Sequence, residues 1–459
     1  MQKNGVGINL QNASLIHSRN SGTSVFLLLV VSLGNYYVSL LMPASHLLNF
    51  WSLAWFSFSS IYVWQDKKVC WLFFPYIFGI FSALLSCFIA EAIGLYLIEI
   101  ESSAYLSGAT SRASSLSAIF IIATYLFVNF LNKNKINMCV ICEIKYVEYK
   151  LFKIFLVLTI AYLLIAMYWS IPPLLTGNNR FNYINDEALP GFRFFYTLIP
   201  FLSFLLALCY IFKLITKNKM ILWILIIILL VIITGEKFSL YMDIFFYFST
   251  PFIIYGSIKL NKKFYSILGT LVIMLFGMVW VNYVMRGDDL NYLFMRMSLQ
   301  GQMIFALDLI STKGIIFDFT KFLESFLGLS IDVGNRSMYH LMHQIAPENT
   351  VNVMIDYNQS FTAPFPSNFP YFFTNEYAPL AIVIYAVPVA YSIYAFYKGI
   401  LSGSLFNAFI SAALFHYMNL ATMMGKTERL IHPIVIFSFI ITLILLGFGA
   451  QYSKRKLSF

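Results

Sequence analysis

The sequence predicts an all-α integral membrane protein that crosses the bilayer about twelve times, as a single polytopic domain over residues 1–459. Hydrophobic residues make up 60% of the chain and charged residues 11%, compared with about 25% charged residues in typical soluble domains. The 47 Phe and 30 Tyr residues suit lipid contact and the interfacial belts of a membrane. A soluble core cannot bury this much apolar surface, whereas a bilayer can.

Twelve apolar segments are long enough, or nearly long enough, to cross the hydrocarbon layer, which needs about 20 residues of helix. The first follows a polar N-terminal stretch, so we expect it to remain as an anchor and not to be cleaved as a signal peptide. The predicted spans are 24–42, 47–64, 70–98, 116–132, 152–170, 195–215, 220–234, 238–257, 264–285, 375–397, 403–423 and 431–450. The seventh and eighth are either two spans joined by a tight turn or one broken span.

The basic residues predict the orientation of these spans. With a cytoplasmic N-terminus, 19 of the 30 Lys and Arg residues fall on the inner side, nearly all in short loops or tails, where the positive-inside rule applies. The acids on that side are only Asp66, Glu143 and Glu148. Both termini are therefore expected in the cytoplasm, and topology accounts for the net charge of +10 without a nucleic-acid partner.

This orientation places two long loops outside, at 171–194 and 286–374. Residues 290–344 of the second loop alternate apolar and polar side chains at helical spacing, which predicts amphipathic helices lying on the membrane surface. The following stretch, 357–373, is rich in Pro, Asn, Ser and Phe and predicts an ordered, non-helical segment. A loop of this length is expected to have a function of its own.

Familiar nucleotide and hydrolase motifs are missing from the sequence. It has no GxxxxGK[ST], no GxGxxG after a strand, no HExxH and no GxSxG. The inner loops are too short to form a nucleotide-binding domain. Cys139 and Cys142 form a CxxC without a second pair, so neither a zinc site nor a disulfide framework is expected. We therefore expect chemistry at the outer face, with no cofactor and no metal.

The outer face is rich in arginine, whereas the inner cations are mostly lysine. A guanidinium group offers a planar fork that binds phosphate with two hydrogen bonds. The outer cations include Arg180, Arg193, Lys237, Arg286, Arg296, Arg336, Lys426 and Arg429. As a group they indicate binding of an anionic lipid head group such as a diphosphate, although any single one could instead pair with a neighbouring acid.

Candidate general bases lie in the same outer regions. Asp288 and Asp289 follow the end of the ninth span, and each could accept a proton from a sugar hydroxyl or simply be solvated. His340 and His343 lie three residues apart on a predicted helix, where they serve either as a base or as part of a polar helix face.

Three ionisable residues fall inside predicted spans, where such groups are candidates for function. They are Glu91, Asp243 and His416. Because they are scattered, we favour the interpretation that they lock helices together.

The arrangement resembles the O-antigen and related polysaccharide polymerases of the Wzy type. The family carries an RX10G pattern in its third outer loop, and here Arg180 and Gly191 are separated by the ten residues FNYINDEALP. The TGEK stretch that ends in Lys237 is similar to the basic, Gly-rich turn of related polymerases. The fifth outer loop, 286–374, departs from the pattern because none of its arginines has a glycine eleven residues further on.

The resemblance implies a GT-C-like architecture in the bacterial inner membrane and an active face in the periplasm. It implies the joining of undecaprenyl-diphosphate-linked oligosaccharide repeats, and possible contact with a chain-length regulator. On this reading the 357–373 aromatics stack against sugar rings, and the base is Asp288, Asp289 or His340. The implied substrate-binding residues are Arg180, Gly191, Lys237, Arg286, Arg296 and Arg336.

Three other functions stay open. An O-antigen ligase shares the architecture and donor, and Arg286 to Leu290 fits its RX3L pattern, but neither His340 nor His343 precedes a glycine at the ligase spacing. A lipid-linked oligosaccharide flippase needs polar residues lining its spans, which are sparse here, and does not need a long outer loop. A membrane scaffold predicts that single arginine substitutions are silent.

Overall fold

Apart from one short hairpin, the secondary structure of the described residues is helical. The computed structural model describes residues 22–63, 67–133, 146–176, 183–235, 239–258, 299–314, 316–356, 359–361 and 364–456, with a few isolated helical positions between 266 and 277. Five of its helices are long and apolar enough to cross a membrane: Thr23–Leu41, Cys70–Ile93, Ala109–Lys133, Val147–Leu175 and Pro366–Leu401. Shorter apolar helices accompany them, so the chain is a helical membrane protein.

The N-terminal part packs around one central helix. It consists of α1 (Gly22–Leu41), α2 (His46–Val63), α3 (Lys67–Ile93), the antiparallel strands β1 (Tyr96–Leu97) and β2 (Ser102–Ser103), and α4 (Ala109–Lys133). Helix α4 is buried on all of its faces over most of its length, because α1, α2 and α18 (Phe369–Leu401) pack around it. A helix that is apolar and buried on all sides is the core of the bundle.

The middle part forms a second layer of helices. It runs through α5 (Tyr146–Trp169), α6 (Pro173–Thr176), a π-turn (Tyr183–Glu187), α8 (Phe192–Thr197), α9 (Ile199–Ile211), α10 (Lys217–Ile233) and α11 (Ser239–Ile254). Helices α9 and α11 pack closely together. The two apolar runs at 220–234 and 238–257 form two helices, α10 and α11.

The C-terminal part contains the large loop and three more apolar helices. The loop holds α14 (Gln302–Ser311), α15 (Phe319–Lys321), a π-turn (Phe322–Phe326), α16 (Ser337–Ile345) and α17 (Glu348–Asp356), with 3-10 turns at Val333–Asn335 and Phe365–Asn368. Helices α18, α19 (Leu405–Met423) and α20 (Pro433–Lys456) follow, and a 3-10 turn, η7 (Thr427–Ile431), joins the last two.

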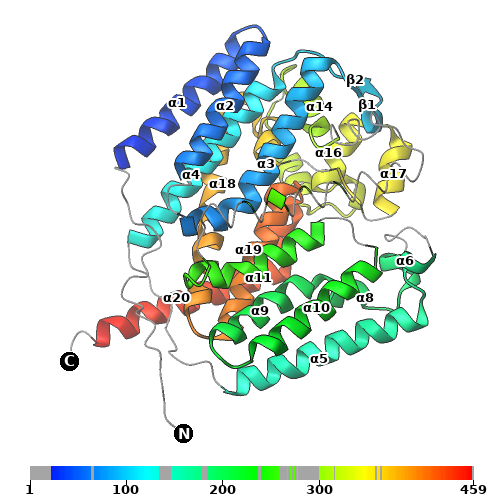
Figure 1. Cartoon of the computed structure of the whole chain (residues 1–459). Helices are drawn as coiled ribbons and strands as arrows, with labels where there is room; N and C mark the ends of the chain where they lie inside the picture. Colours follow the sequence, from blue (N-terminus) through cyan, green and yellow to red (C-terminus); the bar gives the residue numbers. More distant parts are fainter. Residues whose placement is uncertain are drawn as a thin grey trace.

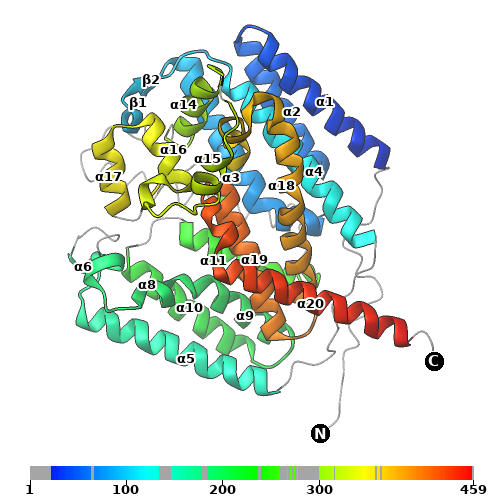
Figure 2. The same ribbon diagram turned by 180° about the vertical axis from the view of Figure 1, so that it is seen from behind.

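The connections predicted to lie outside gather at one end of the bundle. Figures 1 and 2 show α14, α16, α17 and the β-hairpin together at the end that α6 and α8 also approach, while the far end of α20 lies on the opposite side. The predicted orientation puts these connections outside the cytoplasm. We call this end the outer end below.

Most predicted spans coincide with helices, and two helices extend beyond their spans at the outer end. Helix α4 begins at Ala109, before the expected 116, and α18 begins at Phe369, before the expected 375. Thr374 kinks α18 with φ 63° and ψ 161°, a conformation that costs about 1 to 3 kcal/mol for a residue other than glycine. The predicted span 264–285 and residues 236–238 lie mostly or wholly outside the described residues.

Two expectations for the large loop were wrong. Helix α14 does not lie on the membrane surface with an exposed apolar face: Gln302 to Leu307 are buried, and α14 packs against α3, α4 and α18. Gly301 permits this approach, because a Cβ there would lie 2.3 Å from the backbone nitrogen of Cys87.

The 357–373 stretch is helical from Phe369 onward, and its rings at Phe369, Tyr371 and Phe372 are at most 3% exposed. They pack against protein and are not available to stack on sugars.

Candidate functional site

The outer end is organised by a buried carboxylate. Glu91, on α3, is 3% exposed and its two oxygens accept hydrogen bonds from the backbone nitrogens of Gly108 (2.9 Å) and Thr110 (3.0 Å) at the start of α4. The Asn49 side chain donates a further bond of 2.9 Å. A carboxylate is stabilised at a helix N-terminus by unpaired N–H groups and by the helix dipole. Glu91 therefore locks α2, α3 and α4 together, as we expected of the ionisable residues inside spans.

An ion pair that the sequence did not reveal joins the large loop to this core. Arg112 on α4 donates to both carboxylate oxygens of Asp308 on α14, from Nε at 2.8 Å and Nη2 at 2.6 Å. The same guanidinium donates to the carbonyl oxygens of Ser39 (3.1 Å) and Ser107 (2.7 Å). The two side chains are 9% and 10% exposed. Because 196 residues separate the partners, no local pattern could have connected them.

The turn between α19 and α20 is held against the large loop. Ser337, at the start of α16, donates from Oγ to the Gly425 carbonyl (2.7 Å) and accepts from the Thr427 nitrogen (2.7 Å). The Thr427 hydroxyl donates to the Phe326 carbonyl. Gly328 lies directly on Glu428, where a Cβ would come within 2.4 Å of the Glu428 Cβ. These contacts fix the position of the charged residues that follow.

Arg193 and Arg429, from two outer segments, lie near enough to Lys426 for their charges to act on it, and we call Arg193, Lys426, Glu428 and Arg429 the cationic cluster. Burial, followed by the charges of Arg429 and Arg193, lowers the pKa of Lys426, and Glu428 opposes this effect. Arg429 Nε lies 3.7 Å from Glu428 Oε1, too far for a hydrogen bond. Within the described part of the chain, Arg429 Nε and Glu428 Oε2 are buried without hydrogen-bond partners. A buried donor and a buried acceptor left open in this way indicate a place for a polar ligand or water.

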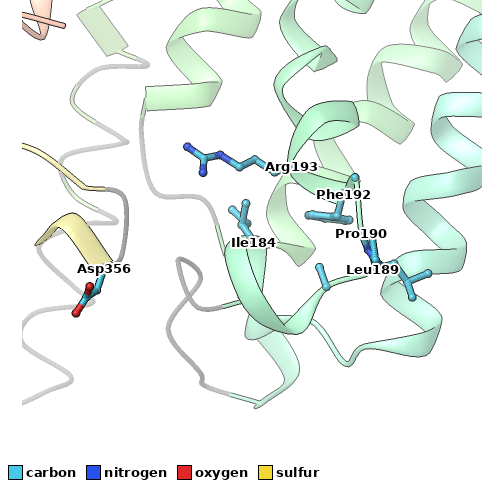
Figure 3. Close-up of a pocket in the computed structure, with 8 residues that line it drawn as sticks. Ile184, Leu189, Pro190, Phe192, Arg193 and Asp356 are labelled. Carbon is cyan, nitrogen blue, oxygen red and sulfur yellow. The ribbon is translucent and has the colours of Figure 1, made fainter. Parts of the chain in front are cut away.

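A pocket of about 250 Å³ opens beside the cationic cluster. Figure 3 shows Arg193 extending from α8 into the space between the third outer loop and α17, with Asp356 across that space at the end of α17. The pocket is lined by Ile184, Ala188, Leu189, Pro190, Gly191, Phe192, Arg193 and Asp356. The two predicted outer loops thus form one concave site, and Arg193 belongs both to the pocket and to the cationic cluster.

A second polar group lies where α15, α16 and α18 meet. The His340 ring nitrogen Nε2 lies 3.1 Å from the Tyr371 hydroxyl, and the Lys321 ammonium lies 3.4 Å from the centroid of the Tyr371 ring. Such a cation–π contact is favourable. Burial, followed by the nearby charges of Lys321 and His343, lowers the pKa of His340 to about 4. Burial lowers the pKa of Lys321 to about 8. His340 is therefore neutral near pH 7 and is a weak base.

The structure describes only some of the predicted site residues. Gly191 lines the pocket. Arg336 donates from Nε to the Ser330 carbonyl (2.6 Å) and from Nη2 to the Ile331 carbonyl (3.0 Å). Two of its guanidinium nitrogens therefore stabilise the loop that precedes it. His340 lies against Tyr371. Outside the described residues are Arg180, Lys237, Arg286, Arg296, Asp288 and Asp289.

The backbone conformation explains why the RX10G pattern ends in glycine. Gly191 has a φ of +88° and directly precedes α8. This left-handed conformation costs an L-residue about 1 to 2 kcal/mol and glycine almost nothing. The turn also directs the Pro190 carbonyl to the Tyr162 hydroxyl, which donates a hydrogen bond to it. Gly191 thus shapes the pocket wall through the backbone.

Comparison with known proteins gives one match. The model of a family of unknown function, DUF6418, matches residues 332–444. The matched part contains Arg336, His340, α18, α19 and the three charged residues of the cationic cluster that follow α19. No curated protein and no solved structure matches the chain.

Proposed function

We propose that this protein polymerises undecaprenyl-diphosphate-linked oligosaccharide repeats into O-antigen or a related surface polysaccharide. The proposal includes twelve spans, a GT-C-like arrangement, and an active face on the periplasmic side of a bacterial inner membrane. A hydroxyl of the incoming repeat attacks the anomeric carbon of the growing chain, the bond to the diphosphate breaks, and undecaprenyl diphosphate leaves.

The observation that carries this proposal is the group of Arg193, Lys426 and Arg429, in which the buried Nε of Arg429 has no hydrogen-bond partner among the described residues. Negative charge develops on the diphosphate as its bond to the sugar breaks, and fixed cations in a partly buried site stabilise that charge. Lys426 and Arg429 lie in the connection between α19 and α20, and in the proposed topology this connection is on the face where a lipid-linked diphosphate would meet the protein. Neither a nucleotide nor a metal is needed, because the diphosphate is already a good leaving group.

The general base is assigned among the three candidates Asp288, Asp289 and His340. With a pKa lowered to about 4, His340 binds a proton poorly near neutral pH, and efficient general bases have a pKa near the working pH. An ordinary aspartate has a similarly low pKa, so pKa does not separate the candidates. We keep Asp288 and Asp289 as the preferred bases for their position after the ninth predicted span, and we assign His340 to positioning through its contact with Tyr371.

The test is complementation of a deletion strain in the protein's own host. Lys426→Gln and Arg429→Gln are compared with wild type and with Lys217→Gln, a control that removes an exposed cation at the inner end of α10. Membrane expression of each variant is confirmed, and extracted polysaccharide is separated on a gel. We expect a ladder from wild type and the control, and a loss of polymer of about a hundredfold from either site variant, with single repeats remaining.

Other outcomes assign other functions. Loss of all repeats from the acceptor, with lipid-linked polymer accumulating in the membrane, would indicate a ligase. Accumulation of lipid-linked single repeats on the cytoplasmic side would indicate a flippase. An unchanged ladder in the deletion strain would refute a role in glycan assembly altogether.

A further inference from the structure

The pocket between the third outer loop and α17 has a composition that differs from the cationic cluster next to it. Its lining carries one guanidinium, Arg193, and one carboxylate, Asp356, together with the half-buried apolar side chains of Ile184 and Leu189. In this pocket one carboxylate balances one cation, whereas the cationic cluster sets three cations against one carboxylate, Glu428, so a diphosphate is better accommodated in the cluster. An uncharged ligand with hydroxyl groups on its edge and C–H groups on its face needs no such excess of cations.

The dimensions of the pocket restrict this ligand further. Its volume of about 250 Å³ is below the range of roughly 300 to 1,000 Å³ that is usual for drug-sized ligands. It therefore suits one ring and not a complete oligosaccharide. Asp356 is exposed at the rim, where its carboxylate can turn toward a ligand, and a carboxylate can accept hydrogen bonds from two neighbouring hydroxyl groups.

We infer that this pocket is a subsite for a single uncharged pyranose ring of the lipid-linked repeat, and that Asp356 is a specificity-determining residue that accepts hydrogen bonds from adjacent ring hydroxyls. Arg193 holds the boundary between this ring and the phosphates bound by Lys426 and Arg429. The inference rests on the proposed function. It has a consequence for specificity: a repeat with an acidic sugar at this position is rejected, because its carboxylate would face that of Asp356.

The first test measures polymer formation in the complemented deletion strain. We expect Asp356→Asn to lower the rate of polymer formation about tenfold, because a hydrogen bond to a charged acceptor contributes about that factor. Glu348→Gln, which removes a carboxylate at the exposed start of the same helix, should retain the wild-type ladder. If Lys426→Gln abolishes the ladder while Asp356→Asn leaves it unchanged, the sugar subsite is wrong and the polymerase proposal stands. If both leave it unchanged, the sugar subsite and the phosphate-binding role of the cationic cluster are both wrong, and an unchanged ladder in the deletion strain itself would refute the polymerase proposal.

The second test measures occupancy of the pocket directly. The full chain with Leu189→Cys, and with Cys139 and Cys142 changed to serine, is placed in lipid nanodiscs and labelled with a maleimide. The other cysteines, Cys70, Cys87 and Cys209, are buried. We expect lipid-linked single repeats, extracted from the deletion strain, to slow labelling of Cys at 189 at least fivefold. Undecaprenyl diphosphate without sugar should not slow it, and adding Asp356→Asn should remove the protection.

Each of the remaining results contradicts the inference. Equal protection by the repeat and by undecaprenyl diphosphate would show that the pocket belongs to the diphosphate. Protection by neither would show that no sugar enters it. Protection that survives Asp356→Asn would leave the pocket occupied but would refute the role of that carboxylate.

Discussion

The ion pair between Arg112 and Asp308 attaches the large outer loop to the bundle, and Asp308→Ala tests how strongly. The substitution leaves a guanidinium with 9% exposure facing a cavity in place of two charge-assisted hydrogen bonds. Removing one partner of such a buried pair costs about 3 to 5 kcal/mol. If the chain of 459 residues unfolds cooperatively, its unfolding entropy near 2.1 cal/mol/K per residue makes this a fall in melting temperature of about 3 to 5 °C.

Thermal unfolding of the purified protein in detergent, followed with a thiol-reactive fluorogenic dye, measures this shift. The dye reports exposure of Cys70, Cys87 and Cys209, which are buried in the folded chain. Asp318→Ala is the control, because Asp318 is an exposed carboxylate of the same loop that caps α15, and we expect a much smaller shift. The double variant Arg112→Met, Asp308→Leu should lose less stability than Asp308→Ala, since an apolar pair leaves no unpaired charge. This account would be refuted by a shift in melting temperature below about 1 °C for Asp308→Ala, or by a double variant that is less stable than Asp308→Ala.

Two further predictions concern the site. Gly191→Ala introduces a side chain at a φ of +88° and should destabilise the protein by about 1 to 2 kcal/mol; Gly34→Ala, in α1 with no atom within 4 Å of the added Cβ, should be neutral or slightly stabilising in the same melting assay. Equal effects of these two alanines would contradict the conformational role of Gly191. For His340, the folded pKa of about 4 lies below the ordinary value of 6.5, so the unfolded chain binds more protons between these values and stability falls as the pH drops from about 6.5 to 4. His340→Gln should show a shallower loss of melting temperature over this range, and identical pH profiles for wild type and His340→Gln would refute the burial of a neutral ring.

The sequence predicted the helical framework well because apolar length is a local property. The hydropathy runs gave α1, α2, α3 and α19 to within a few residues. The start of α4 was missed because it depends on Glu91, whose carboxylate reaches the α4 backbone only in the folded bundle. Helix α14 was misplaced for a related reason: its helical periodicity was clear, but the glycine that lets it approach α3 gives no signal in a hydropathy pattern.

The candidate site could be predicted only in part. The excess of arginine outside indicated an anion site, and Arg193, Lys426 and Arg429 were among the cations named. Their convergence depends on two segments more than 200 residues apart, which a single sequence does not pair. Asp356 was not singled out, because a lone carboxylate near a loop looks like any solvated acid until the opposite wall of its pocket is known.

The position of α14 sets an order for biosynthesis. Arg112 is synthesised 196 residues before its partner Asp308, and chains emerge at about 5 to 20 residues per second. For a period of the order of ten seconds or more, the guanidinium must therefore be held by water or lipid phosphate at the bilayer surface. Because α14 also packs against α18, the outer end can close only after the C-terminal helices have been inserted. A chain that terminated before α14 would keep its first helices in the membrane and would leave Arg112 without its carboxylate partner, Asp308.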